Sequence, residues 1–264
     1  MEDTMKKESI LKKALKFTLM LLPVIIVACL LSVILGINML TEAERIETIE
    51  AYGNIEMYAM MLTIQSLLVP VFCTFFGYLI ALKVRLLKPL IFKKRPLIIT
   101  VIWSVVAGAG VFVMDLLFAI FITMPRAQGA EELTALLLTP VGLGARLLFG
   151  GVVEELMLRL FLMSFIALII WKVFCRKYDS ENIPVKVFVI ANIVAAFIFG
   201  VAHLPIVFAT LDGITVGFII RTIFLNMFGG VIFGELYRKY GLQYAILAHA
   251  GAHVVMVPIQ LVLL

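Results

Sequence analysis

The chain has little charge. Only 15% of its 264 residues are Asp, Glu, Lys or Arg, whereas about a quarter of the residues of a soluble domain are charged. Hydrophobic residues make up 63% of the sequence and the mean hydropathy is +1.14. A soluble protein of this length could not bury so much apolar surface in one core. The composition therefore predicts a membrane protein and leaves no room for a sizeable soluble domain.

Several signatures of known sites are absent. The three cysteines, Cys29, Cys73 and Cys175, are widely spaced within or at the end of apolar segments, which gives neither a disulfide framework nor a metal-finger spacing. We interpret them as core residues. The sequence also contains no Gly-x-Gly-x-x-Gly, phosphate loop, Gly-x-Ser-x-Gly or His-Glu-x-x-His. Asp115 and Asp212 stand alone, without the paired, glycine-flanked aspartates of an intramembrane aspartyl protease.

Long apolar segments dominate what is present, and each spanning helix needs about 20 such residues. The segments predict an all-α polytopic membrane protein with seven to eight transmembrane helices. The stretch 133–174 is too long for one ordinary span, so it is either a long tilted helix or a short extra helix followed by the main one. The segment 38–56 predicts an exposed amphipathic helix or loop. The apolar segments are 15–37, 57–82, 97–124, 141–174, 186–204, 214–236 and 242–264.

The connections between these segments alternate in charge. The N-terminus is basic, 38–56 is acidic, 83–96 is basic, 125–140 is mildly acidic and 172–186 is again basic. Because short cytoplasmic segments carry an excess of Lys and Arg, we expect a cytoplasmic N-terminus, seven crossings and an outer C-terminus. The first apolar run is longer than a signal peptide needs, which favours an uncleaved span. This placement of the net charge of +5 argues against a nucleic-acid partner.

Ionisable residues inside the apolar segments are the informative ones, because they are costly there and usually mark a site or a pathway. Glu154 and Glu155 lie in one such segment with Arg159. Glu155 and Arg159 are four apart, so they share a helix face and can pair. Glu154 points about 100° away on an α-helix, which leaves its carboxylate for other chemistry. A purely structural ion network is the competing interpretation.

All three histidines also fall in apolar segments. His203 ends the run Phe199-Gly200-Val201-Ala202-His203, and His249 and His253 are four apart on one helix face. Imidazoles and carboxylates are the groups that activate water near neutral pH, either directly or through a metal. The sequence therefore predicts a hydrolytic site inside the membrane.

These residues, in this order, resemble the motifs of the CPBP family, the type II CAAX prenyl endopeptidase and bacteriocin-processing (Abi) group. The resemblance covers about 115 residues, from Gly142 to Pro258. It implies N-terminal transmembrane helices over 1–140 and a catalytic helical core over 141–264. The motifs are Glu154-Glu155-x-x-x-Arg159, Phe199-x-x-x-His203, the glycine-rich run Asn226 to Gly234, and His249-x-x-x-His253.

The resemblance also implies roles for the motif residues. Glu154 and His203 would activate the attacking water, and His249 would stabilise the oxyanion. Glu155 and Arg159 would hold the helix geometry, and Gly230 and Gly234 would let helices pack closely. The last motif of the family commonly ends in Asn, whereas this chain has His253, which can donate a similar hydrogen bond or add a metal ligand.

Two mechanisms stay open at this point. One is a metal-free glutamate mechanism with no cofactor, and the other uses a zinc ion held by Glu154, His203 and His249 with an open position for water. Either would serve an intramembrane endopeptidase of a bacterial cell membrane, with membrane lipid and a peptide or protein substrate, lipidated or not, as partners. The alternatives are a proton- or cation-coupled transporter and a non-catalytic bacteriocin-immunity protein.

Overall fold

The chain folds into a bundle of long helices. The computed structural model describes residues 2–122, 135–211 and 213–263, and these contain helices and no strands. Seven helical segments are long and apolar enough to cross a membrane, which confirms an all-α, multi-pass membrane protein. These segments are Ile10–Asn38, Ile55–Lys83, Lys94–Phe121, Pro140–Phe174, Val185–Ala209, Val216–Tyr240 and Leu242–Ile259.

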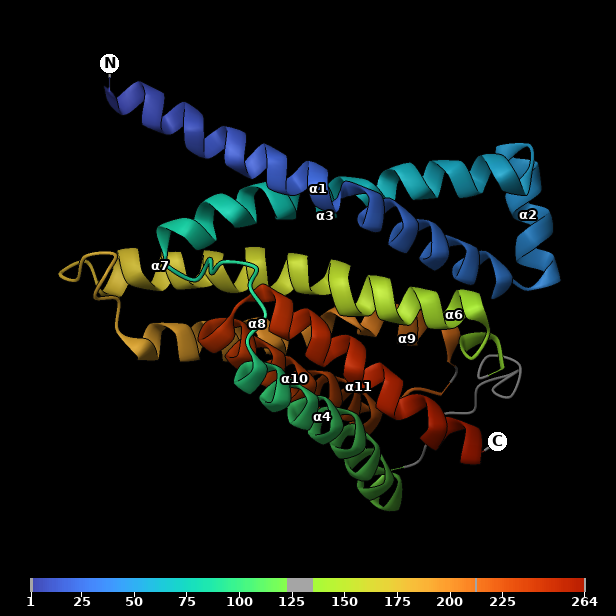
Figure 1. The fold of residues 1–264 in the computed structure, drawn as a ribbon. Helices are drawn as coiled ribbons and strands as arrows, with labels where there is room; N and C mark the ends of the chain where they lie inside the picture. Colours follow the sequence, from blue (N-terminus) through green and yellow to red (C-terminus); the bar gives the residue numbers. More distant parts are fainter. Residues whose placement is uncertain (1, 123–134, 212, 264) are drawn as a thin grey trace.

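The helices are named as in Figure 1. The first four are α1 (Glu2–Asn38), α2 (Glu42–Tyr52), α3 (Ile55–Lys83) and α4 (Lys94–Phe121). A long continuous helix follows, made of α6 (Pro140–Ala145), the π-helical segments η1 (Arg146–Glu154) and η2 (Leu156–Met163), and α7 (Ser164–Phe174). The last four are α8 (Val185–Ala202), α9 (Leu204–Thr210), α10 (Val216–Tyr240) and α11 (Leu242–Leu263).

The stretch 140–174 is a single long helix. Thr139 caps its start, since its hydroxyl accepts a hydrogen bond from the Gly142 amide at 3.1 Å, and Pro140 occupies the first turn, where a missing N–H costs nothing. Pro140 and Gly142 therefore begin this helix. Residues 135–137 are also helical, and a turn at 138 and 139 separates them from it; the start of the predicted short helix, at 133 and 134, lies outside the described residues.

This long helix is the centre of the bundle. α1 and α3 pack against one side of it, whereas α8 and α11 pack against the other and are joined there by α10 and α4 (Figure 1). Its middle is buried, with Val153, Leu156 and Leu160 fully inaccessible to solvent. The exposed apolar side chains lie on the outer helix faces, as a lipid-facing surface requires.

Glycines set the closest helix contacts, as predicted. On α10, a Cβ at Gly230 would meet Ala196 of α8 at 3.0 Å, and a Cβ at Gly234 would collide with the Asn192 side chain. The three cysteines are free and buried, which confirms their interpretation as core residues. The acidic segment after α1 forms α2, which buries no residue, so it is the exposed helix that the sequence predicted.

Candidate active site

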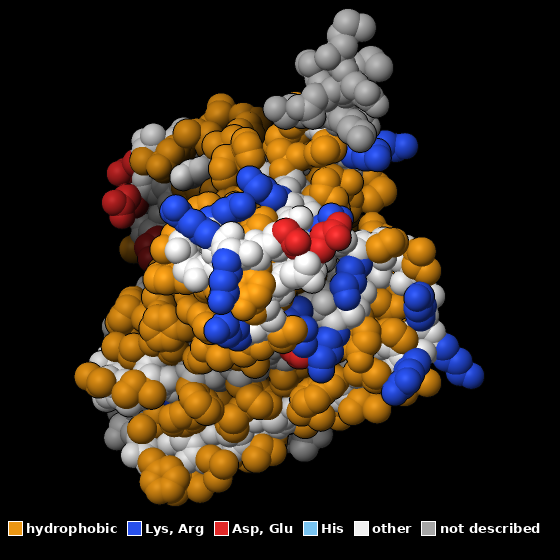
Figure 2. All heavy atoms as spheres, turned by 90° about the vertical axis from the view of Figure 1, so that its left-hand side faces the viewer, with side chains coloured by type: hydrophobic (Ala, Val, Ile, Leu, Met, Phe, Trp, Pro, Cys, Tyr) orange, Lys and Arg blue, Asp and Glu red, His pale blue; other side chains and the backbone are white. Residues whose placement is uncertain are grey.

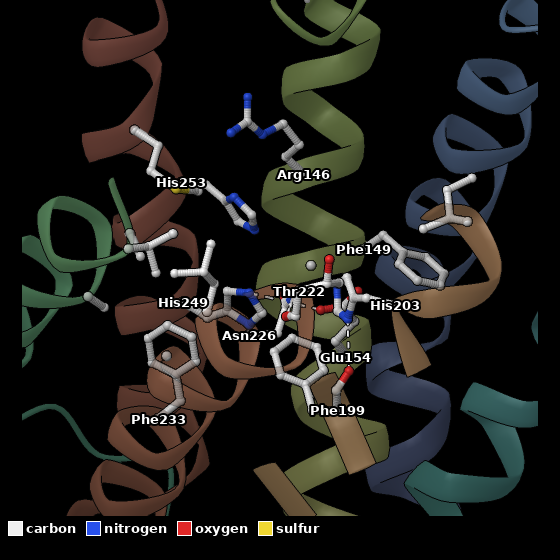
Figure 3. A pocket seen from close by; sticks show the side chains of 18 of the residues that line it. Arg146, Phe149, Glu154, Phe199, His203, Thr222, Asn226, Phe233, His249 and His253 are labelled. Carbon is white, nitrogen blue, oxygen red and sulfur yellow. Dashed lines mark hydrogen bonds and ion pairs between the residues drawn. The ribbon is translucent and has the colours of Figure 1, made fainter. Parts of the chain in front are cut away.

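A cavity of about 480 Å³ lies between the long helix, α8, α10 and α11. It is bordered by all four residues predicted to be catalytic: Glu154 from η1, His203 from the end of α8, and His249 and His253 from α11 (Figure 3). Most of its remaining wall is apolar. The structure thus brings together side chains that are up to about a hundred positions apart in the sequence.

Two adjacent glycines allow α11 to lie against η1. A Cβ at Gly151 would stand 2.8 Å from the Cβ of Ala250, and a Cβ at Gly150 would stand 2.8 Å from Nε2 of His253. Both distances are shorter than real side chains tolerate, so any larger residue would push the helices apart. The glycine pair just before Glu154 therefore sets how close that carboxylate comes to the histidines.

Glu154 faces His249 across this contact. Its Oε2 lies 3.9 Å from Nε2 of His249, and its side chain keeps 19% of its accessible surface. In Figure 3 the side chains of Glu154, His203 and His249 project into one cavity. All three line the same cavity, as a carboxylate and imidazoles that share one molecule of water must do.

His203 is oriented by its own helix. Its Nδ1 lies 2.8 Å from the carbonyl oxygen of Phe199, four residues earlier. A carbonyl oxygen can only accept, so Nδ1 carries the proton and Nε2 of the neutral ring keeps a lone pair. The spacing Phe199-x-x-x-His203 therefore yields an imidazole whose other nitrogen is an acceptor.

Glu155 connects Arg159 to His249. Its Oε2 accepts a hydrogen bond from Nε of Arg159 at 3.1 Å, and its Oε1 lies 3.0 Å from Nδ1 of His249. Glu155 and Arg159 are fully buried. The predicted i, i+4 pair is present, but Glu155 does more than hold its own helix, because it also fixes the ring of a histidine on α11.

Aromatic rings complete the surroundings of the histidines. Phe233 stacks on His249, with ring centroids 4.5 Å apart, and His253 also stacks on His249, at 5.0 Å. Phe199 stands edge-on to His203 at 4.6 Å and lies 5.8 Å from the guanidinium carbon of Arg159. Their packing restricts the rings to the orientations that the hydrogen bonds select.

Two arginines at the cavity were not singled out from the sequence. Arg146 borders it on η1, and Arg221 borders it on α10, where it pairs with Asp115 of α4 at 2.5 Å between Nε and Oδ1. Asp115 is thus an ion-pair partner. The rule that drew attention to Glu154, an ionisable residue within a span, applies equally to Arg146 and Arg221.

A second cavity of about 640 Å³ adjoins the first. It lies between α1, α3 and the long helix, and it shares Ser32 and Phe149 with the cavity that holds the histidines. Its polar wall residues are few: Ser32, Tyr58, Gln65 and Ser66. The sequence offered no signal for it, because its walls are ordinary apolar helix faces.

The donor set does not form a ready metal site. Within the described parts of the chain, no three His, Cys, Asp or Glu side chains are grouped as ligands for one ion. Nδ1 of His203 and Nδ1 of His249 are engaged by Phe199 and Glu155, which leaves Nε2 of each ring toward the cavity. The side chains of Glu154, His203 and His249, as they stand, are not grouped closely enough to hold one ion.

Comparison with known proteins identifies one family. Residues 135–255 match the family described as type II CAAX prenyl endopeptidase Rce1-like. This segment contains Glu154, Glu155, Arg159, His203, His249 and His253. No curated protein and no solved structure matches the chain.

Proposed function

We propose that the chain is an intramembrane endopeptidase, and the proposal is supported by the match of residues 135–255 to the type II CAAX prenyl endopeptidase Rce1-like family. It hydrolyses membrane-associated peptides or C-terminal CAAX-like substrates, lipidated or not. One observation carries the proposal: a carboxylate and three imidazoles line a single cavity between apolar helices. Buried ionisable groups that converge in this way are costly, and they are usually retained for chemistry.

Glu154 and His203 activate the water. Glu154 takes a proton from it while Nε2 of His203, whose Nδ1 is held by Phe199, accepts a hydrogen bond from it. The oxygen attacks the carbonyl carbon of the scissile peptide bond and forms a tetrahedral intermediate. The C–N bond then breaks, and the proton passes from Glu154 to the leaving nitrogen. The products are a carboxylate and an amine.

His249 stabilises the oxyanion. Because Glu155 accepts the proton of its Nδ1, Nε2 can donate only when the ring is an imidazolium. The two carboxylates lie at its two ring nitrogens, with Glu155 Oε1 3.0 Å from Nδ1 and Glu154 Oε2 3.9 Å from Nε2. A donor fixed in advance toward developing negative charge is a large contribution to catalysis in a water-poor cavity. His253, stacked beside it, supplies a second imidazole at the same wall.

The surroundings select the substrate. The cavity lies within membrane-spanning helices, so a peptide must partition into the bilayer, or be anchored to it, before its bond reaches Glu154. A lipid-attached peptide satisfies this requirement. The basic loops, at the other end of the molecule, attract anionic lipid.

Peptide mass spectrometry of membranes tests the proposal. Membranes with the wild-type chain are compared with membranes that carry Glu154→Gln, and Glu235→Gln serves as the control because Glu235 lies at a helix end in ion pairs with Arg238 and Lys239. We expect product peptides with wild type and with Glu235→Gln, and about 10²–10⁴-fold less with Glu154→Gln, the usual worth of a general base. Equal product from the Glu154→Gln membranes would rule the proposal out.

A further inference from the structure

Positive charge is concentrated in four segments. Of the 22 Lys and Arg residues, five lie in the N-terminal segment, six in 83–96, four in 172–186 and two in 235–241. The connections 38–56 and 122–139 hold one each, Arg45 and Arg126. Short segments rich in Lys and Arg remain in the cytoplasm. The four basic segments therefore mark the cytoplasmic side if they share one end of the bundle.

Contacts place these segments at one end. Arg85 pairs with Glu181 at 2.9 Å, which joins the loop after α3 to the loop after α7. Nζ of Lys88 donates to the carbonyl oxygen of Lys239 at 2.5 Å, which joins the first loop to the end of α10. Figure 2 shows Lys and Arg side chains spread over this end, and α1 begins on the same side in Figure 1.

The catalytic cavity lies in the opposite half. The long helix begins at the end opposite to the basic loops, and the cavity borders its residues between Ala145 and Glu154. Helix α10 begins at the same end, and the cavity borders its residues between Arg221 and Phe233. On α8, which ends there, it borders Phe199 and His203. The second cavity lies in the same half, because its walls come from the last part of α1 and the first part of α3.

The half that carries the basic loops is filled with side chains. Arg159, Leu160 and Met163 of the long helix are fully buried, and Tyr237 of α10, also fully buried, lies 3.2 Å from the Ser164 hydroxyl. Trp171 closes the end, with 4% of its surface accessible. This layer separates Glu154 from the basic end.

We propose that the catalytic cavity is entered from the non-cytoplasmic side of the membrane. The inference rests on the proposed function and specifies its substrates: exported peptides, or the outward-facing parts of membrane-anchored peptides and proteins. Peptides confined to the cytoplasm do not reach Glu154. The exposed helix α2, with Glu42, Glu44, Glu47 and Glu50, borders the outer end.

Cysteine labelling of the full-length chain tests the inference. Cys29, Cys73 and Cys175 are replaced by Ala, and single cysteines are introduced as Glu47→Cys on α2, Lys177→Cys in the basic loop after α7, Ser32→Cys in the wall of both cavities and Ser164→Cys in the buried layer. Sealed cells are treated with a membrane-impermeant maleimide before and after permeabilisation. We expect Glu47→Cys and Ser32→Cys to react in sealed cells, Lys177→Cys only after permeabilisation, and Ser164→Cys in neither.

Three results would overturn the inference. They are labelling of Lys177→Cys but not Glu47→Cys in sealed cells, no labelling of Ser32→Cys from outside, and labelling of Ser164→Cys after permeabilisation. Ala167→Cys, at a fully buried position one turn away, replaces Ser164→Cys if that variant does not fold.

A second arm separates this inference from the proposed function. Peptides identified by mass spectrometry are added to sealed right-side-out and inside-out vesicles, with Glu154→Gln as the inactive control. Cleavage only in right-side-out vesicles supports outward access, and cleavage only in inside-out vesicles overturns it while leaving the protease intact. If wild type fails to cleave even in detergent, the proposed function fails, and the labelling still reports the side of access.

Discussion

At the scale of single residues, the site is defined by what holds each imidazole. Nδ1 of His203 contacts the Phe199 carbonyl oxygen and Nδ1 of His249 contacts the Glu155 carboxylate, so each ring keeps Nε2 for the cavity but has a different partner behind it. The partner of His203 is a neutral carbonyl oxygen, whereas the partner of His249 is a buried carboxylate that also pairs with Arg159. The division of roles between them follows from these second partners.

Arg159 is the residue whose loss should cost most stability. Arg159→Gln leaves the buried carboxylate of Glu155 without its cation, and breaking a buried pair costs about 3–5 kcal/mol. Arg238→Gln removes a partly exposed pair with Glu235, for which we expect about 0–1 kcal/mol. Unfolding of both variants in detergent measures the difference, and equal stabilities would contradict the assignment of Arg159 to the buried network.

Metal chelation should leave cleavage unchanged. The candidate donors Glu154, His203 and His249 do not form a three-ligand group in the part of the chain that the structure describes. Peptide cleavage by the purified protein is measured before and after dialysis against a chelator. Inactivation that zinc restores would show that these side chains rearrange around an ion, and the metal-free mechanism would be wrong.

At the scale of elements, the long helix positions the site. Its π-helical turns are wider than those of an α-helix. Such turns are rare in proteins, and those that occur are frequently at functional sites. The angle of about 100° between neighbouring side chains, which holds for an α-helix, does not describe η1. Glu154 and Glu155 consequently both reach His249, one at each ring nitrogen.

The contact between η1 and α11 gives a prediction for Gly151. Gly151→Ala places a methyl group 2.8 Å from Ala250, so the helices must separate, at a cost of about 1–3 kcal/mol. A displacement of about 1 Å can cost about 10²-fold in rate, and we expect a loss of this order in cleavage.

Gly36→Ala is the matched control for stability, because a Cβ at Gly36 meets nothing within 4 Å. Replacing a helical Gly there should stabilise by about 0.5–1 kcal/mol. Thermal unfolding in detergent and peptide cleavage are measured for both variants. Unaltered cleavage by Gly151→Ala would show that the close helix contact does not set the site geometry.

At the scale of the whole molecule, the two halves of the bundle differ. One half contains the cavities and the other contains a packed layer around Arg159 and Tyr237. A carrier must open its site to each side in turn. Here the layer would have to unpack a buried ion pair and several large side chains to open the second side, which favours an enzyme with one-sided access.

Sealed proteoliposomes provide the corresponding test. We expect wild-type protein to leave an imposed pH gradient intact, because no path crosses the packed layer, while it cleaves peptides in the same vesicles. A pH-sensitive dye inside the vesicles reports the gradient, and Glu154→Gln is the control. Gradient loss that requires Glu154, without cleavage, would favour the transporter interpretation instead.

The sequence by itself determined the helical membrane fold and the identity of the site residues. A long apolar segment predicts a membrane-spanning helix whichever helices pack against it. The reason is that lipid requires every backbone N–H and C=O to be hydrogen-bonded within its own helix. An ionisable residue is costly in lipid wherever it stands, so Glu154, Glu155, Arg159 and the three histidines were visible from position alone. The same rule could have found Arg146 and Arg221.

Only the tertiary structure decided how those residues meet. The pairing of Glu155 with His249 and the second cavity depend on distances between helices that are remote in sequence. The rise along each helix, about 1.5 Å per residue, does not by itself fix the height of His249 relative to Glu154. Helix tilt and close packing at Gly150 and Gly151 bring them to 3.9 Å, since contacts between helices, and not the pattern within one, fix their relative height.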